Sequence, residues 1–378
     1  MRGCGHGAMV TAWRSIDKVI HQDRGARLRV VEYSSSSERS APRQRPKIFR
    51  GEGIEMRRIF VVLLVVGVLG ALAGLAAGQA AGKAKGTIKV MLLDGQSAGI
   101  YHNWRLTTPV LKRELEETGL FSVTVVTAPL SGGDFSNFKP EFGDYKVVVM
   151  NIDAPEWPAD LRARFEQYVS GGGGVVIVHA ANNGFPTWPA YNEMTGIGGW
   201  RNRTEAAGPY WYVKDGKLVS DPAPGAAGMH GARLPYQVVA QHPEHPILKG
   251  LPTAWMHFPD ELYGRLRGPG KNMTVLATAH SDAKNRGTGF EEPMLMVLSY
   301  GKGRIFHTVM GHDVAASSCV GFITTFQRGT EWAATGKVTQ KVPANFPTAK
   351  SVSYRVDIAE MDPELLKGAS DPILVYGK

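Results

Sequence analysis

The feature that most restricts the fold of this chain is a series of short apolar runs that alternate with segments of helical pattern. Between the runs, residues 106–118 and 158–170 place apolar side chains at helical spacing. Continuous apolar strands joined through helices are typical of a parallel sheet that is buried on both faces. We therefore expect an α/β fold with a mostly parallel central sheet. The runs with strand composition are residues 88–93, 121–127, 145–151 and 175–178.

The second half of the chain is less regular. Residues 182–235 are rich in Gly, Pro, Asn and aromatic residues, and a loop of this length inside a compact domain is usually functional. The elements expected after it are strands at 236–240 and 273–279, a hairpin of 294–300 with 304–310, and a helix at 317–334.

The segment 56–80 has the layout of a secretory signal peptide. Arg57 and Arg58 precede an apolar run, and the small residues Gly78 and Ala80 mark a cleavage site. A retained membrane anchor is the alternative, because the run is long enough to span a bilayer. We expect a periplasmic or extracellular protein, or a membrane-anchored one in the second case. The expected organisation is an untranslated or disordered extension (1–55), the signal peptide (56–80), one folded domain (81–340) and an irregular C-terminal tail (341–378).

The net charge argues against a nucleic-acid partner. The whole chain carries +9, but residues 1–80 hold 13 Lys/Arg and 6 Asp/Glu, which leaves +2 for the rest. A basic surface for nucleic acid is therefore not expected. The two cysteines, Cys4 and Cys319, offer no pair for a structural zinc site, and an internal disulfide within the domain is excluded.

Polar residues cluster where the expected strands end, which is where open α/β sheets bind ligands. His179 follows a glycine-rich entry and an apolar strand, and His312 follows a later strand and a glycine. An imidazole at such a turn suits acid–base catalysis. Asp260 and Glu261 adjoin aromatic residues, which can raise a carboxyl pKa for acid catalysis. We expect His179 and His312 to form a catalytic pair, with Asp260 or Glu261 orienting one of them or acting as an acid.

Further polar and aromatic residues are expected to hold the substrate. The indole of Trp104 offers an apolar face for a sugar ring. No cofactor is expected, and a divalent metal ion held by His102, His179, His312 and Asp260 is kept as an alternative. The expected substrate-binding residues are His102, Trp104, Asn182, Asn183, Tyr263 and Asp313.

Together these motifs resemble the ThuA-like (trehalose utilisation) family of the class I glutamine-amidotransferase-like superfamily. The matching stretches are YHNW (101–104), GGGGVVIVHAAN (171–182), HPILKGLP (245–252), FPDELY (258–263) and YGKGRIFHTVMGHD (300–313). The resemblance implies a flavodoxin-like three-layer sandwich and a link to disaccharide or keto-sugar utilisation. In true glutamine amidotransferases a nucleophilic cysteine lies in the sharp turn that follows a buried strand. Here the turn after the apolar run 175–178 holds His179. Glutamine hydrolysis is therefore not expected.

The leading hypothesis is an exported enzyme that acts on a small-molecule carbohydrate, a glycoside or a keto-sugar, by histidine-based acid–base chemistry. A hydrolase, a lyase and an isomerase all fit. A non-catalytic sugar-binding or scaffold protein and a metal-dependent hydrolase remain as alternatives. The sequence predicts no oligomeric state.

Overall fold

The computed structural model describes residues 28–32, 86–96 and 101–362. The predicted signal peptide and most of the predicted extension lie outside these residues. Within the described part of the chain, none of the helices combines the length and apolar character needed to cross a membrane.

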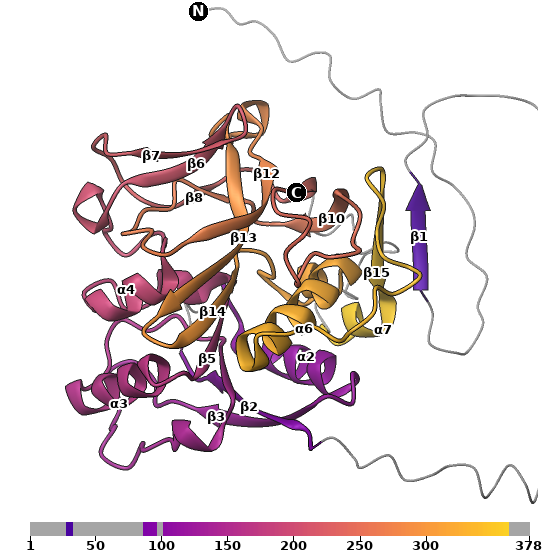
Figure 1. The fold of residues 1–378 in the computed structure, drawn as a ribbon. Helices are drawn as coiled ribbons and strands as arrows, with labels where there is room; N and C mark the ends of the chain where they lie inside the picture. The colour runs from indigo at the N-terminus through magenta and orange to yellow at the C-terminus, as the bar shows by residue number, and fades with distance from the viewer. Residues whose placement is uncertain (1–27, 33–85, 97–100, 363–378) are drawn as a thin grey trace, which may run out of the picture.

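Five parallel strands form the core of one mixed sheet (Figure 1). Their order is β3-β2-β4-β5-β14, so the chain starts in the middle, moves to one side and then crosses to the other. This is the flavodoxin-like order, and it places a topological switch point between β2 and β4. The bounds are β2 (Ile88–Asp94), β3 (Phe121–Thr127), β4 (Val147–Met150), β5 (Gly174–Val178) and β14 (Gly303–Thr308).

Antiparallel strands extend the sheet beyond β14 in the order β13, β12, β9, β10. The expected hairpin is confirmed, with Gly301 and Lys302 in the turn between β13 and β14. The parallel arrangement therefore holds for the first half of the domain, and the sheet as a whole is mixed. The bounds are β9 (Leu234–Ala240), β10 (Ala254–Asp260), β12 (Thr274–His280) and β13 (Glu291–Tyr300).

Helices cover both faces of the parallel strands, as a three-layer sandwich requires (Figure 1). Helices α2 and α6 contact each other on one face, and α3 and α4 lie on the other. Helix α6 packs closely on β14, because Gly329 leaves room for Phe306: a Cβ atom at Gly329 would lie 2.1 Å from that ring. The bounds are α2 (Trp104–Glu116), α3 (Ala159–Ser170), α4 (Pro189–Thr195), α5 (Val314–Ser317), α6 (Val320–Thr335) and α7 (Val356–Ala359).

The long segment 182–235 holds more regular structure than its composition suggests. Besides α4, it forms a hairpin of β6 with β7. Its turn residues Asp215 and Gly216 have φ of 50° and 70°, as a two-residue type I′ turn requires. The sequence Asp-Gly is a known signal for this turn, and it was overlooked in the sequence analysis. The bounds are β6 (Tyr210–Lys214), β7 (Lys217–Asp221), β8 (Met229–His230) and β11 (Tyr263–Gly264).

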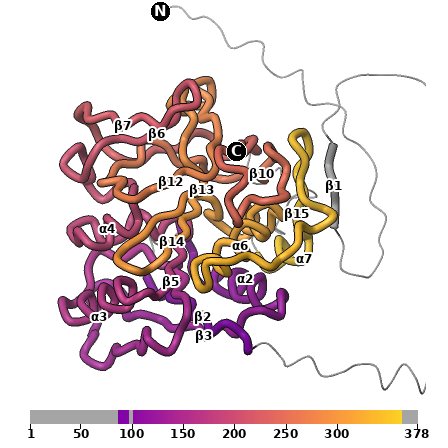
Figure 2. Tube along the Cα trace, in the orientation of Figure 1, coloured from indigo at the N-terminus to yellow at the C-terminus, as the bar shows by residue number. Residues whose placement is uncertain are grey.

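Three other elements differ from the expectations. The single helix expected at 317–334 is divided into α5 and α6 at Ser318 and Cys319. Strand β10 lies in a segment for which no strand was predicted. The tail contains α7 and β15 (Ser351–Arg355), and β15 pairs antiparallel with β1 (Leu28–Glu32) from the N-terminal segment. Figure 2 shows the path of the chain from the parallel strands to the C-terminal elements. The short 3-10 turns are η1 (Phe142–Asp144), η2 (His179–Asn183), η3 (Glu205–Ala207) and η4 (Ala283–Asn285).

Candidate active site

Four side chains from separate segments meet at the carboxyl ends of the parallel strands. His102 follows β2, His179 follows β5 and His312 follows β14, while Glu261 follows β10. One nitrogen or oxygen atom from each lies within 4.8 Å of the others. We call these four residues the His/Glu cluster. They lie beside the topological switch point, where open α/β sheets bind ligands.

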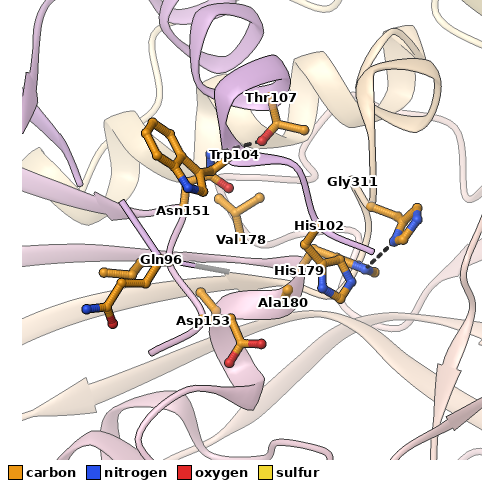
Figure 3. Close-up of a pocket in the computed structure, with 13 residues that line it drawn as sticks. Gln96, His102, Trp104, Thr107, Asn151, Asp153, Val178, His179, Ala180 and Gly311 are labelled. Carbon is orange, nitrogen blue, oxygen red and sulfur yellow. Dashed lines mark hydrogen bonds between the residues drawn. The ribbon is translucent and has the colours of Figure 1, made fainter. Parts of the chain in front are cut away.

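His179 occupies a strained turn between β5 and η2. Its φ is 43°, which is uncommon for a residue with a side chain, and such strain is often found at active sites. The Nδ1 atom lies 2.6 Å from the carbonyl oxygen of Val309. A carbonyl can only accept, so Nδ1 carries the hydrogen and Nε2 is left with a lone pair. That Nε2 faces Nδ1 of His312 at 3.3 Å (Figure 3).

Glu261 is the acid of the cluster. Its Oε2 atom lies 3.1 Å from Nδ1 of His312, 3.8 Å from Nε2 of His179 and 4.0 Å from Nε2 of His102. Burial raises the pKa of this carboxyl, but the neighbouring imidazoles of His179 and His312 outweigh burial and hold the pKa below its ordinary value. Glu261 is therefore ionised at neutral pH, with its charge directed at the imidazoles.

The imidazoles of His102 and His312 differ in the direction of their pKa shifts. Burial, together with the neighbouring His179 and His312, lowers the pKa of His102 to about 2, so that its ring is neutral. Burial also lowers the pKa of His312, but the hydrogen bond to Glu261 outweighs it and raises that pKa above its ordinary value. The buried hydroxyl of Tyr263 lies 3.0 Å from Nε2 of His102.

Asp260 faces the backbone instead of the cluster. Its carboxylate accepts the N–H groups of Gly311 at 2.7 Å, of His312 at 3.2 Å and of Glu261 at 2.7 Å. It also accepts a hydrogen bond from Nε2 of His257 at 2.9 Å. Burial raises the pKa of Asp260, but His257 outweighs burial and lowers it to about 2. Asp260 thus joins the chain after β10 to the chain after β14.

A pocket that is partly open to solvent lies against His102, His179 and His312. Figure 3 shows His102 and His179 at one end of the pocket and Trp104 and Gln96 at the other. The pocket also contains polar residues that the sequence analysis missed. Its lining is Gln96, His102, Trp104, Thr107, Asn151, Ile152, Asp153, Val178, His179, Ala180, Ala181, Gly311 and His312.

Asp153 lines this pocket and pairs with Arg201. The guanidinium of Arg201 donates to Oδ1 of Asp153 at 2.7 Å and to its carbonyl at 3.0 Å. Arg201 belongs to a turn in which Trp200, Arg201 and Asn202 all have positive φ, between 47° and 59°. Asp153 lies just beyond the end of β4, so the strand-end rule could have identified it. Arg201 lies in the irregular segment, and no local signal distinguishes it.

An exposed histidine contacts the cluster from outside. Nε2 of His230 lies 3.6 Å from Oε1 of Glu261, on the side opposite to His312's contact with Oε2. Strand β8 carries His230 and pairs with β11, which places His230 opposite Tyr263. His230 is not among the predicted site residues, because only this strand pairing brings it to the cluster.

The remaining predicted substrate residues have varied surroundings. Trp104 lines the pocket, and the guanidinium of Arg105 lies 4.4 Å from its ring centroid. Asn182 is buried and contacts Nε2 of His307 at 3.2 Å, and Asn183 is buried beside Tyr263.

Asp313, also predicted to bind the substrate, takes part in local structure. Its Oδ1 accepts the N–H of Ala316 at 2.9 Å and caps α5, and its Oδ2 pairs with Arg233. Both carboxylate oxygens are therefore occupied within the protein.

The flavodoxin-like sheet and the polar cluster at its carboxyl edge define an α/β protein with a candidate ligand site at the strand ends, where a histidine follows β5. The sequence profile of the ThuA family, described as trehalose utilisation, matches residues 89–333, and the chain belongs to this family. The resemblance inferred from the motifs is thereby confirmed.

The chain is also similar to proteins of known structure. The chain is similar to a ThuA-like protein from Parabacteroides merdae, with 47% identity over 72% of this chain and 99% of the other, at a TM-score of 0.69. A ThuA-like protein from Bacteroides uniformis has 19% identity over 67% of this chain and 93% of the other, at a TM-score of 0.44. A β-galactosidase from Bacillus circulans sp. alkalophilus has 12% identity over 68% of this chain and 33% of the other, at a TM-score of 0.39. No curated protein matches the chain significantly.

Proposed function

We propose that the chain is an exported enzyme that acts on a carbohydrate, either a glycoside or a keto-sugar, at the His/Glu cluster. The observation that carries this proposal is the convergence of three imidazoles and an ionised carboxylate on the wall of a polar pocket. Membership of a trehalose-utilisation family supports a sugar as the ligand.

The pocket offers the groups that a sugar requires. Gln96, Asp153 and Asn151 supply donors and acceptors for hydroxyl groups, and Trp104 supplies an aromatic face. One buried oxygen of Gln96, Oε1, has no hydrogen-bond partner within the described protein. A buried acceptor without a partner is costly, and a ligand hydroxyl would satisfy it.

The cluster supplies proton transfer beside this pocket. The catalytic residues are His179, His312 and Glu261, and His230 connects Glu261 to solvent. Removal of a proton next to a ketone and protonation of a glycosidic oxygen both need such groups. Asp260 is a positioning residue, because its hydrogen bonds hold the backbone of Glu261 and His312.

The test is turnover of a panel of disaccharides, aryl glycosides and their keto derivatives, with binding followed by calorimetry. We expect turnover of at least one member, and loss of it in His179→Asn and His312→Asn. His280→Ala is the matched control, since this exposed histidine pairs with Glu291 on the surface. Binding without turnover would replace the enzyme by a sugar-binding module, and neither binding nor turnover would reject the proposal.

Export is proposed from the segment 56–80. N-terminal sequencing of the protein from the periplasmic fraction should give a chain that begins close to residue 81. Recovery of the uncleaved chain in the membrane fraction would favour an anchor instead.

A further inference from the structure

We propose that the His/Glu cluster binds one divalent transition-metal ion of the zinc type, with His102, His179, His312 and Glu261 as its ligands. The proposal depends on the proposed function only for the location of the reactive centre. It names a cofactor for that centre, and it can be tested without any sugar.

The distances within the cluster match those of a coordination shell. Zinc binds imidazole nitrogen and carboxylate oxygen at about 2.0–2.2 Å, so the ligand atoms of a tetrahedral site lie about 3.3–3.5 Å apart. Nδ1 of His312 lies 3.1 Å from Oε2 of Glu261 and 3.3 Å from Nε2 of His179. The wider separations are 3.8 Å from Glu261 to His179 and 4.0 Å from Glu261 to His102. The four ligand atoms all lie within 4.8 Å of one another, so the wider pairs must move closer together before the shell is complete.

The surroundings hold the ligands in place. Nδ1 of His179 donates to the carbonyl of Val309 at 2.6 Å, which fixes the lone pair of Nε2 toward the cluster. Hydrogen bonds of this kind to the second ring nitrogen are typical of metal-bound histidines. Asp260 holds the peptide N–H groups of His312 and Glu261, although these ligands come from different strands. These hydrogen bonds fix the backbone positions of His312 and Glu261 without a bound ion.

The donor set selects the class of ion. Three imidazole nitrogens suit zinc, iron, nickel or copper, whereas magnesium and calcium prefer oxygen ligands. The ion would lie at the wall of the pocket, because His102, His179 and His312 all line it. A sugar oxygen entering the pocket could take a further coordination position, as catalytic sites allow.

Metal binding also clarifies which group carries a proton. The ring nitrogens that face the ion give it their lone pairs, so with an ion bound His179 and His312 act as ligands, and the acid–base role given to them above passes to His230. His230 lies outside the ligand set, is exposed to solvent and contacts Oε1 of Glu261 at 3.6 Å. It therefore remains available for the proton transfer that the proposed function requires.

The experiment is elemental analysis and calorimetry on the full-length chain after chelation, desalting and reloading with zinc or magnesium. We expect one zinc ion per chain and no binding of magnesium. The double variant His179→Ala/His312→Ala should retain less than about a tenth of the zinc. His242→Ala is the matched control, because this exposed histidine pairs with Glu244 at 3.1 Å and should leave the zinc content unchanged.

Circular dichroism checks that the wild-type protein and the variants are folded. The visible absorption of the cobalt-loaded wild-type protein reports the coordination of the metal, and it does not depend on any variant. A folded wild-type protein that binds no zinc overturns the proposal, and so does equal zinc content in wild type and the double variant. Zinc bound without turnover on the sugar panel rejects the proposed function and leaves the metal site standing. Turnover by a zinc-free protein that takes up no zinc on reloading supports the proposed function and overturns the metal site.

Discussion

Nδ1 of His312 lies 3.1 Å from Oε2 of Glu261, although β14 and β10 are separated by three strands in the sheet. The contact exists because Asp260, next to Glu261, accepts the N–H groups of Gly311 and His312. One buried carboxylate therefore fixes the backbone, and its neighbour supplies the charge of the site. Asp260 and Glu261 thus have different roles, and the geometry of the site leads to several testable predictions.

Replacing either central histidine should abolish most turnover. His179→Asn and His312→Asn remove a group that touches the substrate or the ion, and positioned proton transfer alone is worth roughly 10²–10⁴-fold. The measurement is kcat/KM on the best sugar of the panel, with His280→Ala as control. Rates close to wild type in both variants would remove the cluster from the reaction.

Asp260→Asn should destabilise the fold. The change leaves buried His257 without its anionic partner, and breaking a buried charge pair costs about 3–5 kcal/mol. Urea unfolding gives the free energy of unfolding directly. Asp282→Asn is the control, because this acid caps the 3-10 turn η4 at the surface and Asn can replace it within about 1 kcal/mol. Equal losses in the two variants would contradict the role given to Asp260.

Arg201→Met should weaken sugar binding more than catalysis. Arg201 orients the Asp153 carboxylate in the pocket, and a hydrogen bond to a charged group is worth about 1.5–3 kcal/mol, or roughly 10- to 150-fold in KM. We expect KM to rise with a smaller change in kcat and no change in zinc content. Arg162→Met, at a surface pair with Glu156, is the control. A fall in kcat alone would place Arg201 outside the binding pocket.

Glu292→Gln should change how stability depends on pH. Burial raises the pKa of Glu292 from 4.5 to about 7, although hydrogen bonds from Thr288 and Tyr210 oppose the shift. The folded state holds this proton more tightly than the unfolded state, so the stabilisation is complete below pH 4.5 and is lost as the pH rises through 7. The span amounts to about 3 kcal/mol, at 1.36 kcal/mol per pKa unit.

The glutamine variant has no charge to lose at this position. Its free energy of unfolding should therefore fall less than that of the wild type between pH 5 and pH 8. Urea unfolding at the two pH values is the measurement. Parallel curves for the two proteins would show that Glu292 does not titrate in this range.

Gly311→Ala should disturb the turn that carries His312. Gly311 has a φ of 102°, and an added Cβ would lie 2.6 Å from the ring of Phe322. We expect a loss of stability together with reduced zinc content, since the neighbouring ligand moves. Gly143→Ala is the control, because nothing lies within 4 Å of a Cβ there. An unchanged melting temperature in Gly311→Ala would show that the turn adapts freely.

Much of the site could be predicted because parallel strands end at one edge. His102, His179 and His312 follow strands β2, β5 and β14, and short length, β-branched residues and flanking glycines help to identify such strands from the sequence. Arg201 and His230 could not be predicted in this way. Both lie in a segment whose position depends on contacts with distant residues, Asp153 for the first and the β11 strand for the second.

The sequence by itself determined the parallel half of the sheet and the family, since both follow from local apolar patterns and short motifs. Only the tertiary structure decided which carboxylate of the pair at 260 and 261 enters the cluster. Adjacent side chains of an extended chain point in opposite directions, and long-range hydrogen bonds select between them. Here the N–H groups after β14 bind Asp260, which leaves Glu261 to face the three imidazoles.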